Sequence, residues 1–205
     1  LCGVGSPISQ NGAQSCTGSV SAGSCSIAFT TSGTKLLSAT YSGDANFFGS
    51  ASAYANHVVA ASATTTAITN AAALATDTLV GQSYLVTYSV TPAAGGTPTG
   101  NVTVSDGINT CVNTVTAGMC VLTSTTAGVK SLTATYAGDG SFAGSTSSPV
   151  SHVVKAAGTT TVITSDLPDP SLVGQTVQIG FSVAAVDPGS GTPTGNVTVS
   201  DGIES

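Results

Sequence analysis

Charged residues are scarce in this 205-residue sequence, which contains three lysines, no arginine and nine acidic residues. The formal net charge is −6. Binding to nucleic acid or to an anionic membrane surface depends on clustered basic side chains that neutralise phosphates. The composition therefore excludes a nucleic-acid partner, and we expect a surface built mainly from Ser, Thr, Asn, Gly and Ala.

Long apolar runs, tryptophan and helical periodicity are also absent. A helix needs about 20 consecutive apolar residues to cross a bilayer, whereas the longest apolar runs here are only a few residues. We therefore expect no membrane insertion within this segment. Val, Ile, Leu, Tyr and Phe do recur at alternating positions, a pattern that disordered chains lack and that predicts β-strands.

An internal repeat with a period of roughly 95 residues organises the sequence. When Cys16–Val59 is aligned with Cys111–Val154, half of the positions are identical, and "LVGQ" and "GTPTGNVTVSDG" each occur twice. On this period, residues 61–155 form one complete unit. Residues 1–60 are then the C-terminal part of a preceding unit, and residues 156–205 are the N-terminal part of a following one.

Both ends of the sequence fall inside a repeat. An isolated half of a sandwich would expose unpaired strand edges and an apolar face. We expect the sequence to be an excerpt of a longer continuous chain. The alternative is that neighbouring subunits complete the partial units by strand addition.

Strand patterns fill the complete unit, because Val and Tyr alternate with Thr and Ser as half-buried strands require. Asp106-Gly107 predicts a hairpin with a type I′ turn, in which both central residues have positive φ, and Asp201-Gly202 repeats this turn. Seven strands in one unit are the signature of an immunoglobulin-like sandwich. The sequence thus predicts an all-β chain of tandem sandwiches, with strands near 64–69, 84–91, 101–105, 108–115, 119–125, 130–137 and 149–154.

Several of these motifs resemble bacterial Ig-like repeat domains. They are "GTPTGNVTVSDG", the paired cysteines, "AGVKSLTATYAGDGSFAGSTS" and the closing "HVV". The resemblance covers nearly the whole chain except about the first dozen residues. It implies tandem domains of long secreted or surface-attached bacterial proteins, where such repeats serve as stalks, adhesin shafts and spacers, and it supplies no catalytic residues.

Cys111 and Cys120 are placed where neighbouring antiparallel strands would bring them within disulfide range. Cys16 and Cys25 occupy the same positions one period earlier. We expect one disulfide in each unit, with free buried thiols as the alternative; zinc is disfavoured because no second cysteine pair completes four ligands. Disulfides imply an extracellular or cell-surface location. Cys2 has no counterpart, so it is either unpaired or bonded outside this chain.

Acidic residues near the expected unit junctions raise a weaker calcium hypothesis, for which Asp139, Asp166 and Asp169 are the candidates. Calcium needs six to eight oxygen ligands, and the sequence contains no D-x-D-x-D-G loop. An aspartate in a turn commonly accepts hydrogen bonds from its own backbone. We favour this turn role and expect no metal and no cofactor.

The other recurring polar residues favour structural roles. His57 and His152 are equivalent, each near the end of a unit, and we expect them to act at unit junctions. Lys35 and Lys130 are also equivalent, and we expect them at solvated strand ends, with an internal isopeptide bond as the alternative. Tyr136 is expected in the core, with its hydroxyl reaching a loop.

These observations favour a structural, non-catalytic repeat segment of an extracellular bacterial fibre, stalk or adhesin shaft. Its partners would be neighbouring copies of the same repeat, in the same chain or in a fibre. The alternative is an extracellular module that recognises a glycan or surface protein through loops at the sandwich ends, but those loops lack exposed aromatic platforms. An enzyme is not expected, because no pair of titratable groups recurs at catalytic spacing.

Overall fold

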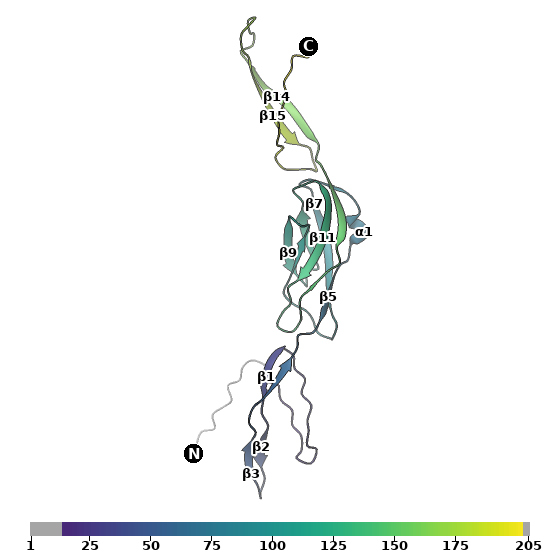
Figure 1. Cartoon of the computed structure of the whole chain (residues 1–205), viewed down its shortest axis with the longest axis vertical. Coiled ribbons are helices and arrows are strands. Elements are labelled where there is room, and N and C mark those ends of the chain that lie inside the picture. The colour runs from purple at the N-terminus through teal and green to yellow at the C-terminus, as the bar shows by residue number, and fades with distance from the viewer. Residues whose placement is uncertain (1–13, 203–205) are drawn as a thin grey trace.

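A computed structural model describes residues 14–202 of the chain. Three parts follow one another along a long axis (Figure 1). We call residues 14–60 the N-terminal segment, residues 61–155 the central unit and residues 156–202 the C-terminal segment. The central unit lies between the two segments, which occupy opposite ends of the molecule.

The central unit consists of two β-sheets. The first has the strand order β10-β7-β5 and contains β5 (Thr64–Ile68), β7 (Ser83–Pro92) and β10 (Met119–Thr123). The second has the order β6-β13-β11-β8-β9 and contains β6 (Thr78–Leu79), β8 (Asn101–Ser105), β9 (Thr110–Thr114), β11 (Gly128–Tyr136) and β13 (Val150–Lys155). All seven expected strands are present. The sequence missed β6, β12 (Ser145–Thr146) and helix α1 (Ala71–Leu74), which are too short to show a period of their own.

The core lies between these sheets, because alternate residues of each strand point inward. Every second residue of β7 from Tyr84 to Tyr88 is buried, as are Val102 and Val104 of β8. The remaining core residues come from β10, β11 and the segments beside them: Leu74, Cys120, Leu122, Leu132, Ala134, Tyr136 and Phe142. The predicted all-β sandwich is confirmed for the central unit.

The N-terminal segment contains two separate strand pairs, formed by β1 (Gly33–Leu37) with β4 (Ala55–Val59) and by β2 (Thr40–Gly43) with β3 (Phe48–Ala51). Its register repeats that of the central unit one period later. Lys35 lies opposite His57 in β1–β4. Lys130 lies opposite His152 in β11–β13.

The C-terminal segment contains one strand pair, β14 (Thr159–Leu167) with β15 (Gln178–Ala185). Thr161 lies opposite Val183 in this pair, as Thr66 lies opposite Val90 in β5–β7. The sequence "NVTVS" behaves differently in the two places where it occurs. It forms β8 in the central unit, whereas residues 196–200 form no strand.

Candidate functional site

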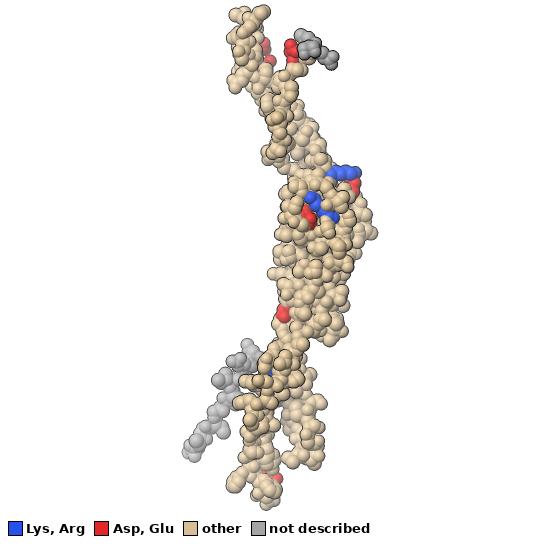
Figure 2. All heavy atoms as spheres, in the orientation of Figure 1, with Lys and Arg blue, Asp and Glu red and all other residues tan. Residues whose placement is uncertain are grey.

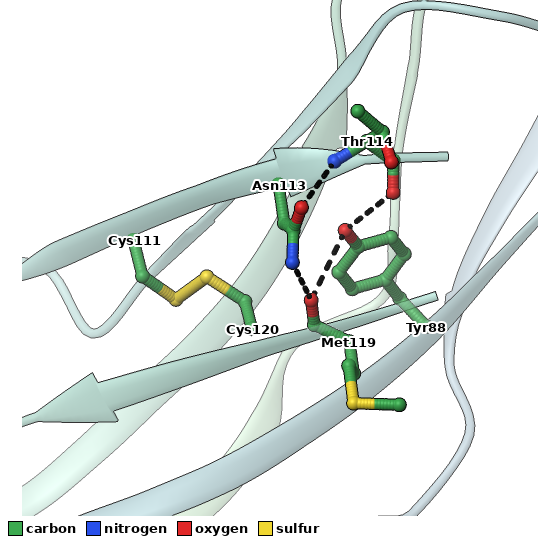
Figure 3. Close-up of a disulfide and its surroundings, with 6 residues drawn as sticks. All are labelled: Tyr88, Cys111, Asn113, Thr114, Met119 and Cys120. Atoms are coloured by element: carbon green, nitrogen blue, oxygen red, sulfur yellow. Dashed lines mark hydrogen bonds between the residues drawn. A yellow bond between two sulfur atoms is a disulfide. The ribbon is translucent and has the colours of Figure 1, made fainter. Parts of the chain in front are cut away.

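A disulfide between Cys111 and Cys120 joins the two sheets of the central unit (Figure 3). Their Cα atoms are 6.0 Å apart. Cys111 lies in β9 of the second sheet and Cys120 in β10 of the first. The prediction that both lie on neighbouring strands of one sheet is therefore wrong. The loop from Val115 to Gly118 carries the chain from one sheet to the other, so the bond clamps the two layers at their edge.

Polar contacts close the same edge of the sandwich beside the disulfide. The Tyr88 hydroxyl donates to the backbone carbonyl of Thr114 at 2.9 Å. The Asn113 side-chain amide donates to the carbonyl of Met119 at 3.0 Å, which links β9 to β10 a second time (Figure 3). Each contact crosses between the sheets and therefore supports the clamp.

The second disulfide joins Cys16 to Cys25 in the N-terminal segment, with Cα atoms 5.8 Å apart. Both disulfides span nine positions of sequence. Cys25 is exposed, whereas Cys120 is buried in the core. Cys2 lies outside the described residues.

Asp106 begins the loop between β8 and β9, but the turn is not type I′. No described non-glycine residue has positive φ, and Gly107 supplies φ of +94°. The loop spans four residues, and the Asp106 carboxylate accepts hydrogen bonds from the backbone N–H groups of Ile108 and Asn109. The hairpin is therefore present, whereas the predicted turn type is wrong because the aspartate side chain organises a longer loop.

Asp106 also belongs to a buried polar network that the sequence did not reveal. Its second carboxylate oxygen accepts a hydrogen bond from the Ser124 hydroxyl, which lies 2.9 Å from the Tyr84 hydroxyl. Burial alone would raise the pKa of Asp106. Hydrogen bonds from Ser124 and from the two backbone N–H groups, with the nearby Lys130 charge, outweigh burial and lower this pKa.

Lys130 is only 6% exposed, so the expected solvated strand end is wrong. Its ammonium group donates to the Thr126 hydroxyl at 2.6 Å. Lys35 makes the equivalent contact with Thr31 at 2.8 Å in the N-terminal segment. Each lysine therefore ties the start of its strand to the preceding loop.

Asp139 joins two loops at one end of the central unit. One carboxylate oxygen accepts hydrogen bonds from the N–H groups of Ser141 and Phe142. The other accepts from the N–H and the hydroxyl of Thr99, at 2.8 and 2.7 Å. The N–H of Ser141 and the two groups of Thr99 hold the pKa of Asp139 well below its usual range. Asp44 makes the equivalent turn one period earlier, with contacts from Asn46 and Phe47.

The remaining acidic candidates do not come together. Asp166 lies in β14 and Asp169 in the bend after it, and both are exposed. Asp201 and Gly202 lie in an exposed stretch, where Gly202 has φ of +80°. Within residues 14–202, no group of three or more His, Cys, Asp or Glu side chains is arranged to hold a metal ion.

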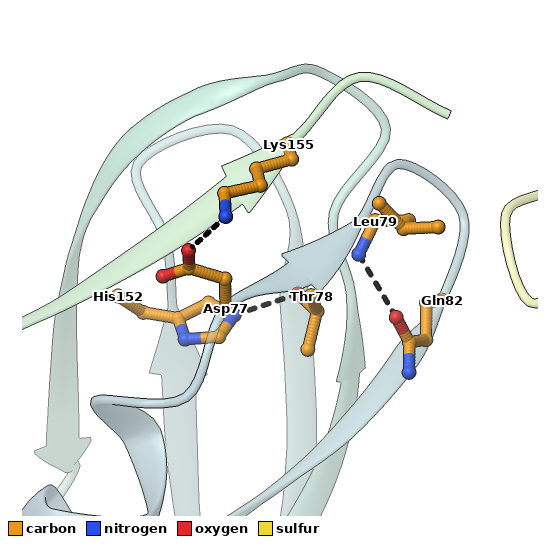
Figure 4. Close-up of polar contacts among 6 residues, drawn as sticks. All are labelled: Asp77, Thr78, Leu79, Gln82, His152 and Lys155. Carbon is orange, nitrogen blue, oxygen red and sulfur yellow. Dashed lines mark hydrogen bonds and ion pairs between the residues drawn. The ribbon is translucent and has the colours of Figure 1, made fainter. Parts of the chain in front are cut away.

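His152 is buried and links helix α1 and β6 to β13. Its Nδ1 lies 2.8 Å from the Leu74 carbonyl and its Nε2 lies 2.8 Å from the Thr78 hydroxyl. Because a carbonyl only accepts hydrogen bonds, Nδ1 carries the proton. The neighbouring Lys155–Asp77 ion pair closes the same end of the unit at 2.6 Å (Figure 4). The equivalent His57 is exposed and stacks on Phe29 instead.

Tyr136 is buried in the core, as expected. Burial and the neighbouring Asp139 carboxylate raise the pKa of its hydroxyl. This hydroxyl has no hydrogen-bond partner within the described part of the chain. The equivalent Tyr41 hydroxyl donates to Asp44 at 2.9 Å.

Backbone carbonyl groups provide the contacts between the three parts. At the first junction the Gly140 carbonyl accepts from the Ser32 N–H and hydroxyl, at 3.1 and 2.6 Å. The Thr30 carbonyl accepts from the Ser141 hydroxyl at 2.9 Å. The second junction uses Ser190, whose N–H and hydroxyl donate to the carbonyls of Val80 and Gly81, each at 2.9 Å. Short polar contacts therefore set the position of each part relative to the next.

Charge contributes little to the visible surface, where charged atoms form small isolated groups (Figure 2). No helix among residues 14–202 has the length and apolar composition needed to cross a membrane. The site features of the central unit are thus an inter-sheet disulfide, buried polar contacts and end loops that touch the neighbouring parts.

Two facing sheets clamped by this disulfide define the central unit as an immunoglobulin-like β-sandwich. Comparison with known families agrees, because residues 68–155 match the model described as "Bacterial Ig-like domain (group 3)". The matched residues cover nearly all of the central unit. No curated protein matches the chain. The presence of a bacterial Ig-like domain suggests a structural or adhesion-type surface module. Domains of this kind are generally non-catalytic.

Proposed function

We propose that this chain is a rigid, non-catalytic spacer segment of an extracellular bacterial fibre, stalk or adhesin shaft. In this proposal the N-terminal and C-terminal segments belong to further Ig-like units, and successive units stack end to end. Repeats that contact only their neighbours form extended rods. The chain would then separate two points in space instead of transforming a substrate.

One observation carries the proposal, namely the polar contacts at both junctions. They are short, and their acceptors are backbone carbonyls. The neighbouring strands fix the positions of these carbonyls. Each junction also follows a connection of only a few residues, such as Ala60–Ala63 between β4 and β5. Short connections and fixed contacts both limit bending between neighbouring units.

The disulfides support an extracellular location, because such bonds persist outside the reducing cytoplasm. They also suit a load-bearing role. The Cys111–Cys120 bond prevents the two sheets of the sandwich from separating at this edge under tension. A surface poor in charge leaves few long side chains whose ion pairs would weaken as salt concentration rises.

Small-angle X-ray scattering of the full chain tests the proposal. The expected profile is that of a stiff rod with the width of one sandwich. A short Gly-Ser insertion after Ala156 should make the rod bend and shorten its mean end-to-end distance. The same insertion after Ser148, in an exposed loop of the central unit, should leave the profile nearly unchanged. A compact profile for the unaltered chain, or equal effects of both insertions, would contradict the proposal.

A further inference from the structure

One loop of the central unit, residues 139–143, contacts three different partners at the first junction. We call it the junction loop. We infer that this loop fixes the angle between the N-terminal segment and the central unit, and that Asp139 is its positioning residue. The inference rests on the proposed end-to-end arrangement. It adds to that arrangement the side chain on which the stiffness of this junction depends.

On its outer side the junction loop binds the N-terminal segment. The Gly140 carbonyl accepts both donors of Ser32, the N–H at 3.1 Å and the hydroxyl at 2.6 Å. The Ser141 hydroxyl donates to the Thr30 carbonyl at 2.9 Å. Two successive residues of the loop make these contacts, so a movement of the loop carries the N-terminal segment with it.

On a second side the junction loop binds the connection between β4 and β5, in which Ser62 lies. The Ser62 N–H donates to the Ser141 carbonyl at 2.8 Å, and the Ser62 carbonyl accepts from the Ala143 N–H at 2.8 Å. Ser62 and Phe142 thereby form a parallel β-bridge. The Thr64 hydroxyl, at the start of β5, donates to the Ala143 carbonyl at 2.7 Å. Because these bonds follow one another along the connection, it does not act as a free hinge while the loop stays in place.

Two side chains attach the junction loop to the body of the sandwich. The Phe142 ring is 8% exposed and lies against Gly96, where an added Cβ atom would come within 2.7 Å of the ring. One carboxylate oxygen of Asp139 accepts from the N–H groups of Ser141 and Phe142, inside the loop. The other accepts from the N–H and hydroxyl of Thr99, just before β8. Hydrogen bonds to an ionised carboxylate are stronger than those between neutral groups, so Asp139 provides a strong polar link between the loop and the sandwich.

The Asp44 turn, one period earlier, has the same internal structure without the junction. The Asp44 carboxylate accepts from the N–H groups of Asn46 and Phe47, and the Asp44 N–H donates to the Phe47 carbonyl at 2.9 Å. Asp139 makes the same backbone contact with the Phe142 carbonyl, also at 2.9 Å. Asp44 lies between β2 and β3, at the end of the N-terminal segment that points away from the central unit (Figure 1). It therefore provides a matched control for Asp139.

Loss of the Asp139 carboxylate separates the contacts on the two sides of the junction loop. The loop keeps its hydrogen bonds with Thr30 and Ser32 of the N-terminal segment, but it loses those with Thr99. Loop and segment then move together relative to the sandwich. The strand pairs of both sheets keep their hydrogen bonds, so the central unit stays folded while the angle at the first junction varies.

Double electron–electron resonance on the full chain tests the inference, because it measures the distribution of distances between two spin labels. The labels are attached through Thr34→Cys in β1 and Ser131→Cys in β11, both exposed positions, with Cys2→Ser as background. The unaltered junction should give a single narrow distribution. Asp139→Ala should broaden it at least about twofold, because its charge-assisted hydrogen bonds are lost. Asp44→Ala should leave the width unchanged.

Ser141→Ala provides a second test that leaves Asp139 in place. It removes the hydroxyl contact with the Thr30 carbonyl, so it should broaden the distribution less than Asp139→Ala does and leave the melting curve of the central unit unchanged. If Asp139→Ala does not fold, Ser141→Ala decides, and an unchanged width overturns the inference. Equal widths for Asp139→Ala and Asp44→Ala would also overturn it, while the rod-like scattering of the proposed spacer would remain. A broad distribution in the unaltered chain would contradict both the inference and the proposed stiff spacer.

Discussion

Removal of the Cys111–Cys120 disulfide should destabilise the central unit by an amount that the closed loop determines. The bond joins residues nine positions apart. Closing a loop of this size lowers the conformational entropy of the unfolded chain, which raises the free energy of unfolding by about 2.5 kcal/mol at 25 °C. For a unit of this length, such a loss lowers the melting temperature by roughly 10–20 °C. The double substitution Cys111→Ala with Cys120→Ala should show this loss.

Urea unfolding followed by tyrosine fluorescence and circular dichroism would measure the effect. The chain contains no tryptophan, so tyrosines of the central unit, including buried Tyr84 and Tyr136, report on its core. The matched control is the Cys16→Ala and Cys25→Ala pair, which opens a loop of equal length outside the central unit. This control should leave the main transition in place. An unchanged midpoint in the first variant, or equal shifts in both, would refute the assignment of the bond as a clamp between the sheets.

Three further predictions concern polar side chains of the central unit. His152→Ala should lower the free energy of unfolding by about 3 kcal/mol in urea titrations, because it leaves two buried groups without their hydrogen-bond partner. His57→Ala should lower it by less than about 0.5 kcal/mol. Tyr136→Phe should change the free energy of unfolding by less than about 0.5 kcal/mol, since no hydrogen bond is lost, whereas Tyr88→Phe should lower it by about 1 kcal/mol. A larger loss for Tyr136→Phe than for Tyr88→Phe would contradict these contacts. Asp139 has a lowered pKa when folded, so its stabilisation is present above about pH 4 and is lost as the pH falls further. Asp139→Asn should therefore flatten the acid side of a stability-against-pH curve, and an unchanged slope would argue against the loop contact.

The sequence predicted the strands of the central unit well, because alternating Val, Thr and Tyr record which side of each strand is buried. It also placed each cysteine next to its partner in the repeat. It did not predict that Cys111 and Cys120 lie in different sheets. Strand pairing across a sandwich depends on the path of the loop between them, and the spacing of two cysteines is compatible with either path.

The polar interior could not be predicted from the sequence. Lys130 and Asp106 are residue types that usually lie at the surface, and each has a simple role at a strand end or a turn. Their burial follows from the tertiary positions of Ser124 and Thr126, which have no sequence signature. The local sequence pattern therefore specified the strands, whereas contacts between loops determined whether these two side chains are buried.

The two copies of "NVTVS" show most clearly that local sequence alone does not determine the structure. Identical residues form β8 where β9 and β11 flank them, and form no strand at residues 196–200. Strand propensity alone does not supply the hydrogen-bond partners that a strand needs. The second copy is therefore expected to become a strand only when a partner edge is present.

Electron microscopy of the full chain tests the central claim of end-to-end Ig-like units most directly. The ten residues of β7 span about 33 Å, so one unit with its end loops is roughly 40 Å long. Units stacked end to end should give slender particles that are one sandwich wide and clearly longer than a single unit. Compact particles no longer than a single unit would contradict the end-to-end arrangement.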